Sequence, residues 1–153
     1  MAVDVSTEIV IRCPREQVAD YSANPDNAPQ WYVNIKEIQW KSAPPLSLGS
    51  KIAFVANFLG RRLAYTYEIV ELEPGRRLVM STEEGPFPME TTYTWEDTDE
   101  GGTRMRLRNR GSPAGFSSLM APFIATSMRR ASQKDLLRLK EILEGGSANE
   151  QVA

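Results

Sequence analysis

The chain has 153 residues, the usual size of one domain with a single hydrophobic core. Its 18 Lys and Arg residues nearly balance 20 Asp and Glu residues, so it lacks the basic excess typical of proteins that bind nucleic acid or anionic lipid. Histidine is absent, which excludes Ser-His-Asp and Cys-His triads and histidine-ligated zinc, and leaves Asp, Glu, Tyr, Lys or water to move protons in any reaction.

The first predicted elements are a strand and two short helices. Val3 to Arg12 alternate apolar and polar residues with the period of two that is typical of a half-buried strand. Pro14 to Tyr21 form a proline-led helical segment, which Asn24-Pro25 ends. A second short helix is predicted over Asp26 to Tyr32, with its first residue as the cap.

The middle of the chain reads as a series of strands joined by hairpin turns. An extended pattern returns at Ile35, Ile38 and Trp40, and further strands are predicted at Lys51 to Leu59, Arg62 to Leu72, Arg77 to Thr82, Met89 to Glu96 and Thr103 to Arg110. Glycine-containing turns separate most of them. The total is about seven strands.

A long amphipathic helix is predicted near the C-terminus. Pro122 suits its start, and the pair Gly145-Gly146 is expected to end it after Glu144. We expect one domain over residues 1–146 and a disordered tail over residues 147–153.

The sequence also indicates where the protein is located. The N-terminus does not resemble a secretory signal, and the single cysteine, Cys13, cannot form an intramolecular disulfide. No apolar run reaches the roughly 20 residues of a membrane-spanning helix. We therefore expect a cytoplasmic protein without a transmembrane segment.

The order of these elements resembles that of the START-like helix-grip superfamily, also called SRPBCC. The most specific similarity lies in residues 13–21, Cys-Pro-Arg-Glu-Gln-Val-Ala-Asp-Tyr, and 24–31, Asn-Pro-Asp-Asn-Ala-Pro-Gln-Trp. These segments look like the first and second helices of polyketide cyclase/dehydrase-like members. The resemblance implies an α+β helix-grip fold, in which a curved antiparallel sheet of about seven strands surrounds a long C-terminal helix and leaves an apolar cavity; it implies no particular reaction.

Candidate ligand-binding residues are those expected to face this cavity. On the strands they are Phe54, Phe58, Tyr65, Tyr67, Met80, Thr82, Tyr93, Trp95, Met105 and Leu107, and on the helix they are Met120, Ile124 and Met128. Each could equally be an ordinary core residue. As a set, methionines and tyrosines indicate a deformable lining with a few hydroxyl groups.

Candidate catalytic residues are few. Tyr65, Tyr67 and Asp135 could move protons, although Asp135 could instead pair with a lysine or arginine at the border of the helix. A β-bulge in the Arg62 to Leu72 strand would turn both tyrosines outward. Trp31 could cap the mouth of the cavity or pack its helix against the sheet.

Four arginines, at positions 104, 106, 108 and 110, share one face of the last predicted strand. They resemble a phosphate-binding strip, but Glu90 and Glu96 share their face across the predicted hairpin. The pattern therefore favours a solvated outer face with cross-strand ion pairs.

Three functions remain open. The first is binding of a small hydrophobic molecule such as a lipid, a polyketide or an aromatic metabolite; the second is a polyketide cyclase or dehydratase that acts in the same cavity. The third is a protein-interaction module similar to the chaperone-activating branch of the superfamily. We predict no metal site, no cofactor and no nucleic-acid partner, and the sequence does not indicate an oligomeric state.

Overall fold

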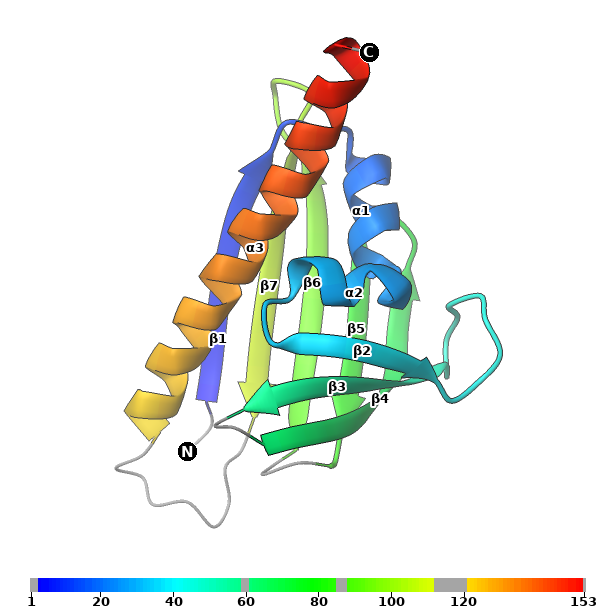
Figure 1. Cartoon of the computed structure of the whole chain (residues 1–153), viewed down its shortest axis with the longest axis vertical. Coiled ribbons are helices and arrows are strands. Elements are labelled where there is room, and N and C mark those ends of the chain that lie inside the picture. The colour runs from blue at the N-terminus through cyan, green and yellow to red at the C-terminus, as the bar shows by residue number, and fades with distance from the viewer. Residues whose placement is uncertain (1–2, 59–60, 85–87, 112–120, 153) are drawn as a thin grey trace.

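The computed structural model describes residues 3–58, 61–84, 88–111 and 121–152. Within them, seven strands form one sheet in the order β1-β7-β6-β5-β4-β3-β2, with every neighbouring pair antiparallel. The strands are β1 (Val3–Ile11), β2 (Ile35–Trp40), β3 (Lys51–Phe58), β4 (Arg61–Glu73), β5 (Arg77–Thr82), β6 (Met89–Asp97) and β7 (Thr103–Gly111). The sheet is strongly curved, so that β2 and β3 run across the direction of β6 and β7 (Figure 1).

The helices lie on one side of this sheet. Between β1 and β2 are α1 (Arg15–Ala23), a 3-10 turn (Pro25–Asn27) and α2 (Ala28–Trp31), and the long α3 (Ala121–Val152) follows β7 and packs along β1 (Figure 1). This is the predicted helix-grip architecture, including the two short helices between the first two strands.

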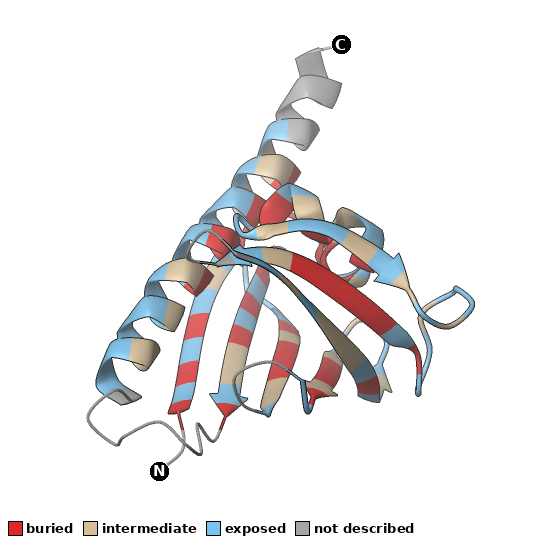
Figure 2. Cartoon of the chain, turned by 60° about the horizontal axis from the view of Figure 1, so that its bottom comes forward, coloured by how far each residue is buried: buried red, intermediate tan, exposed pale blue. Residues whose placement is uncertain are grey.

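Strand alternation separates the buried face of the sheet from the exposed one. Val3, Val5 and Ile11 of β1 are buried, whereas Asp4, Ser6 and Glu8 between them are exposed, as Figure 2 shows by the alternating bands on the strands. The same alternation of buried and exposed residues was the basis for predicting the strands.

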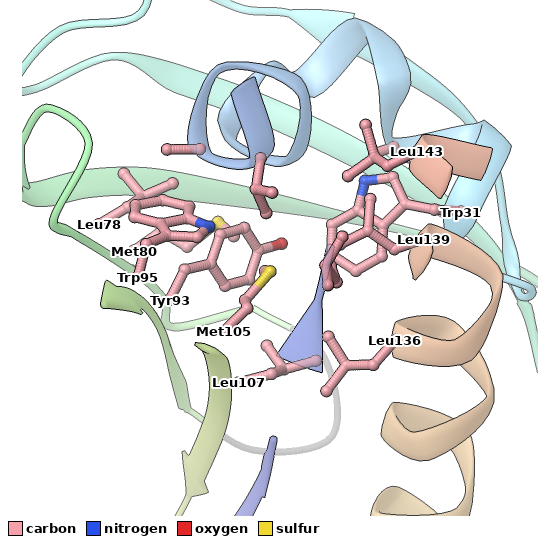
Figure 3. Close-up of a cluster of buried hydrophobic side chains, with 14 of the residues drawn as sticks. Trp31, Leu78, Met80, Tyr93, Trp95, Met105, Leu107, Leu136, Leu139 and Leu143 are labelled. Atoms are coloured by element: carbon pink, nitrogen blue, oxygen red, sulfur yellow. The ribbon is translucent and has the colours of Figure 1, made fainter. Parts of the chain in front are cut away.

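The core lies where the C-terminal half of α3 meets the inner face of the sheet. Leu136, Leu139 and Leu143 of α3 belong to one buried cluster with Met105 and Leu107 of β7 (Figure 3). Trp31 of α2 lies in this cluster beside Leu139 and Leu143, and no part of its side chain is exposed. Trp31 therefore packs its helix against the core, one of its two predicted roles.

Two local predictions are wrong. The cap of the turn after α1 is Asn24, whose side chain accepts a hydrogen bond from the Asp26 amide at 3.0 Å; the Asp26 carboxylate instead accepts from the Trp40 indole at 2.9 Å. Helix α3 continues past Gly145-Gly146 to Val152. Glycine lowers helix stability by only about 1 kcal/mol, and Ala148, Glu150 and Gln151 beyond it favour a helix. The segment expected to be a disordered tail is thus helical through Val152, and the domain boundary at residue 146 stays a prediction.

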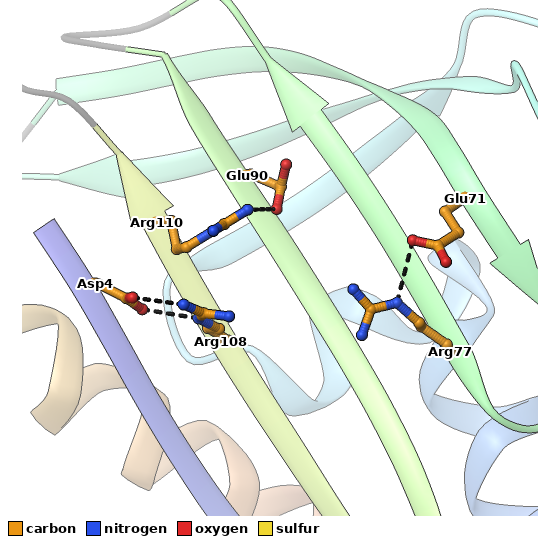
Figure 4. Close-up of polar contacts among 6 residues, drawn as sticks. All are labelled: Asp4, Glu71, Arg77, Glu90, Arg108 and Arg110. Carbon is orange, nitrogen blue, oxygen red and sulfur yellow. Dashed lines mark hydrogen bonds and ion pairs between the residues drawn. The ribbon is translucent and has the colours of Figure 1, made fainter. Parts of the chain in front are cut away.

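Three of the four predicted arginines form ion pairs on the outer face of the sheet. Arg110 pairs with Glu90 of β6 as predicted, while Arg108 forms two hydrogen bonds with Asp4 of β1, at 2.9 and 2.6 Å (Figure 4). Arg106 pairs with Glu8 at 3.2 Å. The acidic partners on β1 were not predicted, because pairing between the first and last strands is not visible in a local pattern.

Candidate functional site

A pocket of about 130 Å³ lies on the inner face of the sheet. It is lined by residues from α2's C-terminal end and from β2, β3, β4, β5, β6 and β7, namely Tyr32, Ile35, Phe54, Ala56, Tyr65, Tyr67, Met80, Thr91 and Asn109. Most of this lining is aromatic or apolar, and its hydrogen-bonding groups are hydroxyls and one amide.

The register of β3 and β4 turns the two tyrosines into this pocket. Tyr65 lies opposite Phe54, and the rings of Phe54 and Tyr67 meet edge to face with centroids 5.5 Å apart. The anticipated bulge exists, but it falls between Ile69 and Glu71 of β4, beyond both tyrosines. Tyr65 and Tyr67 therefore keep their inward orientation.

A chain of polar groups runs along one side of the pocket. The Thr91 hydroxyl donates to the Asn109 side-chain oxygen at 2.7 Å, and the Asn109 amide donates to the Ser132 hydroxyl of α3 at 3.4 Å. Burial raises the pKa of Tyr67 to about 12, although a hydrogen bond with Thr91 lowers it in part. Tyr67 is therefore a neutral hydrogen-bonding group at physiological pH.

A second polar group joins α2 to the sheet and α3. The hydroxyls of Tyr32 and Tyr93 hydrogen-bond to each other, and burial raises the pKa of both. The Asp135 carboxylate of α3 accepts a hydrogen bond from the Val33 amide at 2.9 Å. Burial raises the pKa of Asp135 to about 6, against the lowering effect of this hydrogen bond.

Of the two roles weighed for Asp135 from the sequence, the structure does not show the ion pair, and the role in proton transfer stays a prediction. Asp135 forms no ion pair within the described part of the chain, and it is not among the described residues that line the pocket. Its charge does act on Tyr32 and Tyr93, since it contributes to the raised pKa of each. A carboxyl group with a pKa of about 6 can gain or lose a proton near neutral pH.

The structure separates the predicted ligand-binding residues into groups. Phe54, Tyr65, Tyr67 and Met80 line the pocket, and Phe54 and Met80 also belong to the buried core cluster. Tyr93, Trp95, Met105 and Leu107 are packed in that core cluster and do not line the pocket, although Trp95 also borders the larger hollow described below. Thr82 lines a different hollow at the far end of β5 and β6. The side chains of Phe58 and Met120 lie outside the described residues.

The predicted wall on α3 is elsewhere. Ile124 and Met128 pack against Val3 and Val5 in a small cluster apart from the pocket, and Phe123 is 69% exposed. The helix lies over the β1 edge of the sheet, so the N-terminal half of its apolar stripe contacts that edge strand.

Five pocket residues were not predicted: Tyr32, Ile35, Ala56, Thr91 and Asn109. Asn109 could have been predicted from the sequence, because it follows Thr103, Met105 and Leu107 at the same spacing of two residues along β7 and so faces inward with them. Tyr32 follows the last residue of α2 and belongs to no helix or strand. The spacing of apolar residues in those elements therefore does not predict where its side chain points.

A larger hollow of about 500 Å³ lies between α1, the β2–β3 connection and the turn at Pro74-Gly75. Pro25, Pro44, Pro45 and Trp40 contribute to its walls. Asp20, Asn24 and Asp26 also line it, so this hollow presents carboxylates and an amide, whereas the described lining of the tyrosine-lined pocket carries no charged side chain.

The family described as polyketide cyclase / dehydrase and lipid transport matches residues 2–144. The chain belongs to this family. The match spans every strand and the described part of α3 that packs in the core, so the fold and the pocket both lie within the polyketide cyclase/dehydrase and lipid transport domain.

Solved structures share the fold of this family member at low sequence identity. TTHA0849 from Thermus thermophilus is 20% identical, with a TM-score of 0.78 over 94% of this chain and 99% of that protein. The di-domain ARO/CYC BexL from the BE-7585A biosynthetic pathway is 19% identical, with a TM-score of 0.77 over 92% of this chain; the chain spans 46% of its length. Ara h 8.0201 is 12% identical, with a TM-score of 0.74 over 95% of this chain and 99% of that protein. No curated protein sequence matches the chain.

Two further properties of this polyketide cyclase/dehydrase family member concern the described residues. None of their helices combines the length and apolar character needed to cross a bilayer. Nor do they contain a group of three or more acidic or cysteine side chains arranged to hold a metal ion.

Proposed function

We propose that the chain binds a small hydrophobic molecule in the tyrosine-lined pocket between the sheet and α2. The observation that carries this proposal is the lining itself, in which aromatic rings, one methionine and a few hydroxyls surround about 130 Å³. Burial of apolar ligand surface provides about 25 cal/mol per Å² removed from water, and the hydroxyl groups orient the ligand. Lipids, polyketides and aromatic metabolites are the candidate classes, and membership of the family is consistent with each.

A reaction in the same pocket is the second candidate. The Asp135 carboxyl, with its pKa of about 6, lies near Tyr32 and Tyr93, and Tyr32 lines the pocket. Such a group could exchange a proton with a bound carbonyl compound in a cyclase or dehydratase. Loss of turnover in Asp135→Asn with retained ligand binding would separate this function from binding alone.

The interaction-module alternative gains no support from the outer face, because three of its arginines already pair with acidic residues of β1 and β6. The expected cytoplasmic location stays a prediction.

The binding function can be tested by filling the pocket. Ala56 lines it, so Ala56→Phe should occupy its volume, whereas Ala64 is exposed on the other face of the same hairpin and Ala64→Phe is the matched control. Saturation-transfer NMR would use three probes: p-cresol, 2-naphthol and myristate. We expect at least one probe to bind the wild type and the Ala64→Phe variant, and binding to be lost in Ala56→Phe. If no probe binds, or if Ala56→Phe binds as well as the wild type, the proposal is wrong.

A further inference from the structure

We propose that the pocket selects a neutral aromatic molecule of a single ring that carries one hydrogen-bonding substituent, as in a phenol. This inference rests on the proposed binding function and narrows it, because it excludes long acyl chains and multi-ring polyketides as the preferred ligand.

The size of the pocket gives the first argument. Sites for drug-sized ligands measure about 300 to 1,000 Å³, and an apolar cavity of about 150 Å³ accepts benzene. At about 130 Å³, the pocket matches one ring. A second fused ring would extend beyond this volume, so it would gain less burial against the lining than the first ring.

The walls give the second argument. Phe54 and Tyr67 meet edge to face, and Met80 and Tyr32 contribute a thioether and a further ring to the lining. Aromatic rings and thioethers favour contact with the face or edge of another ring by about 0.5 to 1.5 kcal/mol beyond the burial of area. A flat aromatic guest therefore gains more here than an alkyl chain of equal volume.

The polar side of the pocket specifies a substituent. Asn109 carries two amide protons, and Ser132 accepts one of them. Thr91 and Tyr67 bring hydroxyl groups to the same side of the pocket. A hydroxyl on the guest can accept from the second amide proton and donate to a tyrosine or threonine oxygen, whereas a bare hydrocarbon gains neither bond, and each such bond contributes about 0.5 to 1.5 kcal/mol.

The charges around the pocket exclude an ionised substituent. None of the described lining residues is Asp, Glu, Lys or Arg. The negative charge of Asp135 acts on the lining residue Tyr32 and would repel an anion. Lys36 and Arg138 line an adjoining hollow of about 280 Å³, which shares Tyr32 and Ile35 with the pocket, but neither cation lines the pocket itself. An anionic guest would therefore be desolvated without a counter-charge.

The experiment measures dissociation constants by NMR titration of the full chain with matched probes. p-Cresol is the reference, toluene lacks the hydroxyl, p-toluate carries a charge, 2-naphthol adds a ring, and myristate represents lipids. We expect p-cresol to bind at least about tenfold more tightly than each of the other four, which corresponds to about 1.4 kcal/mol.

A variant then tests the polar side. Thr91→Val keeps the shape of the side chain and removes its hydroxyl, so p-cresol affinity should fall about three- to tenfold while toluene affinity changes less than twofold. Tyr21→Phe removes a hydroxyl that bonds to Gln30 away from the pocket, and serves as the control.

The outcomes separate this inference from the binding function. Tighter binding of 2-naphthol or myristate, abolished by Ala56→Phe, overturns the single-ring inference and leaves the proposed function standing. Tighter binding of p-toluate overturns the requirement for a neutral guest. Failure of all five probes to bind overturns both proposals.

Discussion

Replacing Asp135 by asparagine should stabilise the fold at neutral pH, although it removes a charged side chain from the candidate site. Asp135 is only 7% exposed, and burial raises its pKa from 3.8 to about 6. At about 1.4 kcal/mol per tenfold change in proton affinity, the ionised carboxylate costs the folded state about 3 kcal/mol above pH 7. Asparagine keeps an oxygen that can accept from the Val33 amide and carries no charge.

The sign of the effect depends on pH. Because the folded pKa is raised, Asp135 contributes its full stability below about pH 4 and loses it as the pH rises through about 6. Asp135→Asn should therefore increase the free energy of unfolding by about 2 to 3 kcal/mol at pH 7.5 and change it little at pH 4.

Urea denaturation at the two pH values measures this difference. Asp20 is an exposed residue of α1, and Asp20→Asn is the matched control, which we expect to change the unfolding free energy by less than about 0.5 kcal/mol at either pH. A loss of stability in Asp135→Asn at pH 7.5, or an equal change at both pH values, would show that the carboxylate is not penalised by burial and would refute the reasoning.

Three further substitutions test the packing around the site, each by thermal or urea unfolding. Ser22→Ala removes the acceptor of the buried Trp95 indole, which lies 3.0 Å from the serine oxygen, and should cost about 1 to 3 kcal/mol; an unchanged unfolding free energy would mean that the indole finds another partner. Gly75→Ala should cost about 1 to 2 kcal/mol, because the residue has φ of +76° and an added Cβ would lie 3.0 Å from an Arg15 guanidinium nitrogen; a neutral effect would contradict the strained turn. Gly145→Ala, in contrast, meets no atom within 4 Å inside α3 and should stabilise by about 0.5 to 1 kcal/mol, whereas destabilisation would argue against helix at this position.

Most of the fold could be predicted from local patterns. The strand Arg77–Thr82 has the predicted bounds, and the other strands differ from prediction by one residue at each shifted end. Apolar and polar residues alternate clearly along β1 and most of β7, so a period of two locates these strands. Strands β3 and β5 have runs of buried residues, and the glycine- and proline-containing turns locate them instead. The end of α3 could not be found in this way, because a glycine pair weakens a helix without forbidding it.

The candidate site was predicted only in part, for reasons of long-range geometry. Phe54, Tyr65 and Tyr67 were found because one hairpin carries all three on its inner face. The contribution of Tyr32 depends on how α2 approaches the sheet, and the position of Met128 depends on α3 lying over β1. The spacing of apolar residues in the sequence predicts neither of these two helix positions.

The pairing of β1 with β7 has a consequence for synthesis. Within the described residues, β7 is the only sheet neighbour of β1, and Val3 lies opposite Gly111, about a hundred residues later in the chain. During synthesis, β1 cannot form its hydrogen bonds to β7 until β7 has left the ribosome, and until then the apolar side of β1 lacks the cover it has in the folded sheet. Such non-local pairing slows folding and exposes a strand edge in the interval. Asp4 and Glu8, which pair with arginines of β7 in the folded protein, place negative charge on one side of the unpaired β1. Charged side chains on an unpaired strand disfavour its addition to the edge of another sheet.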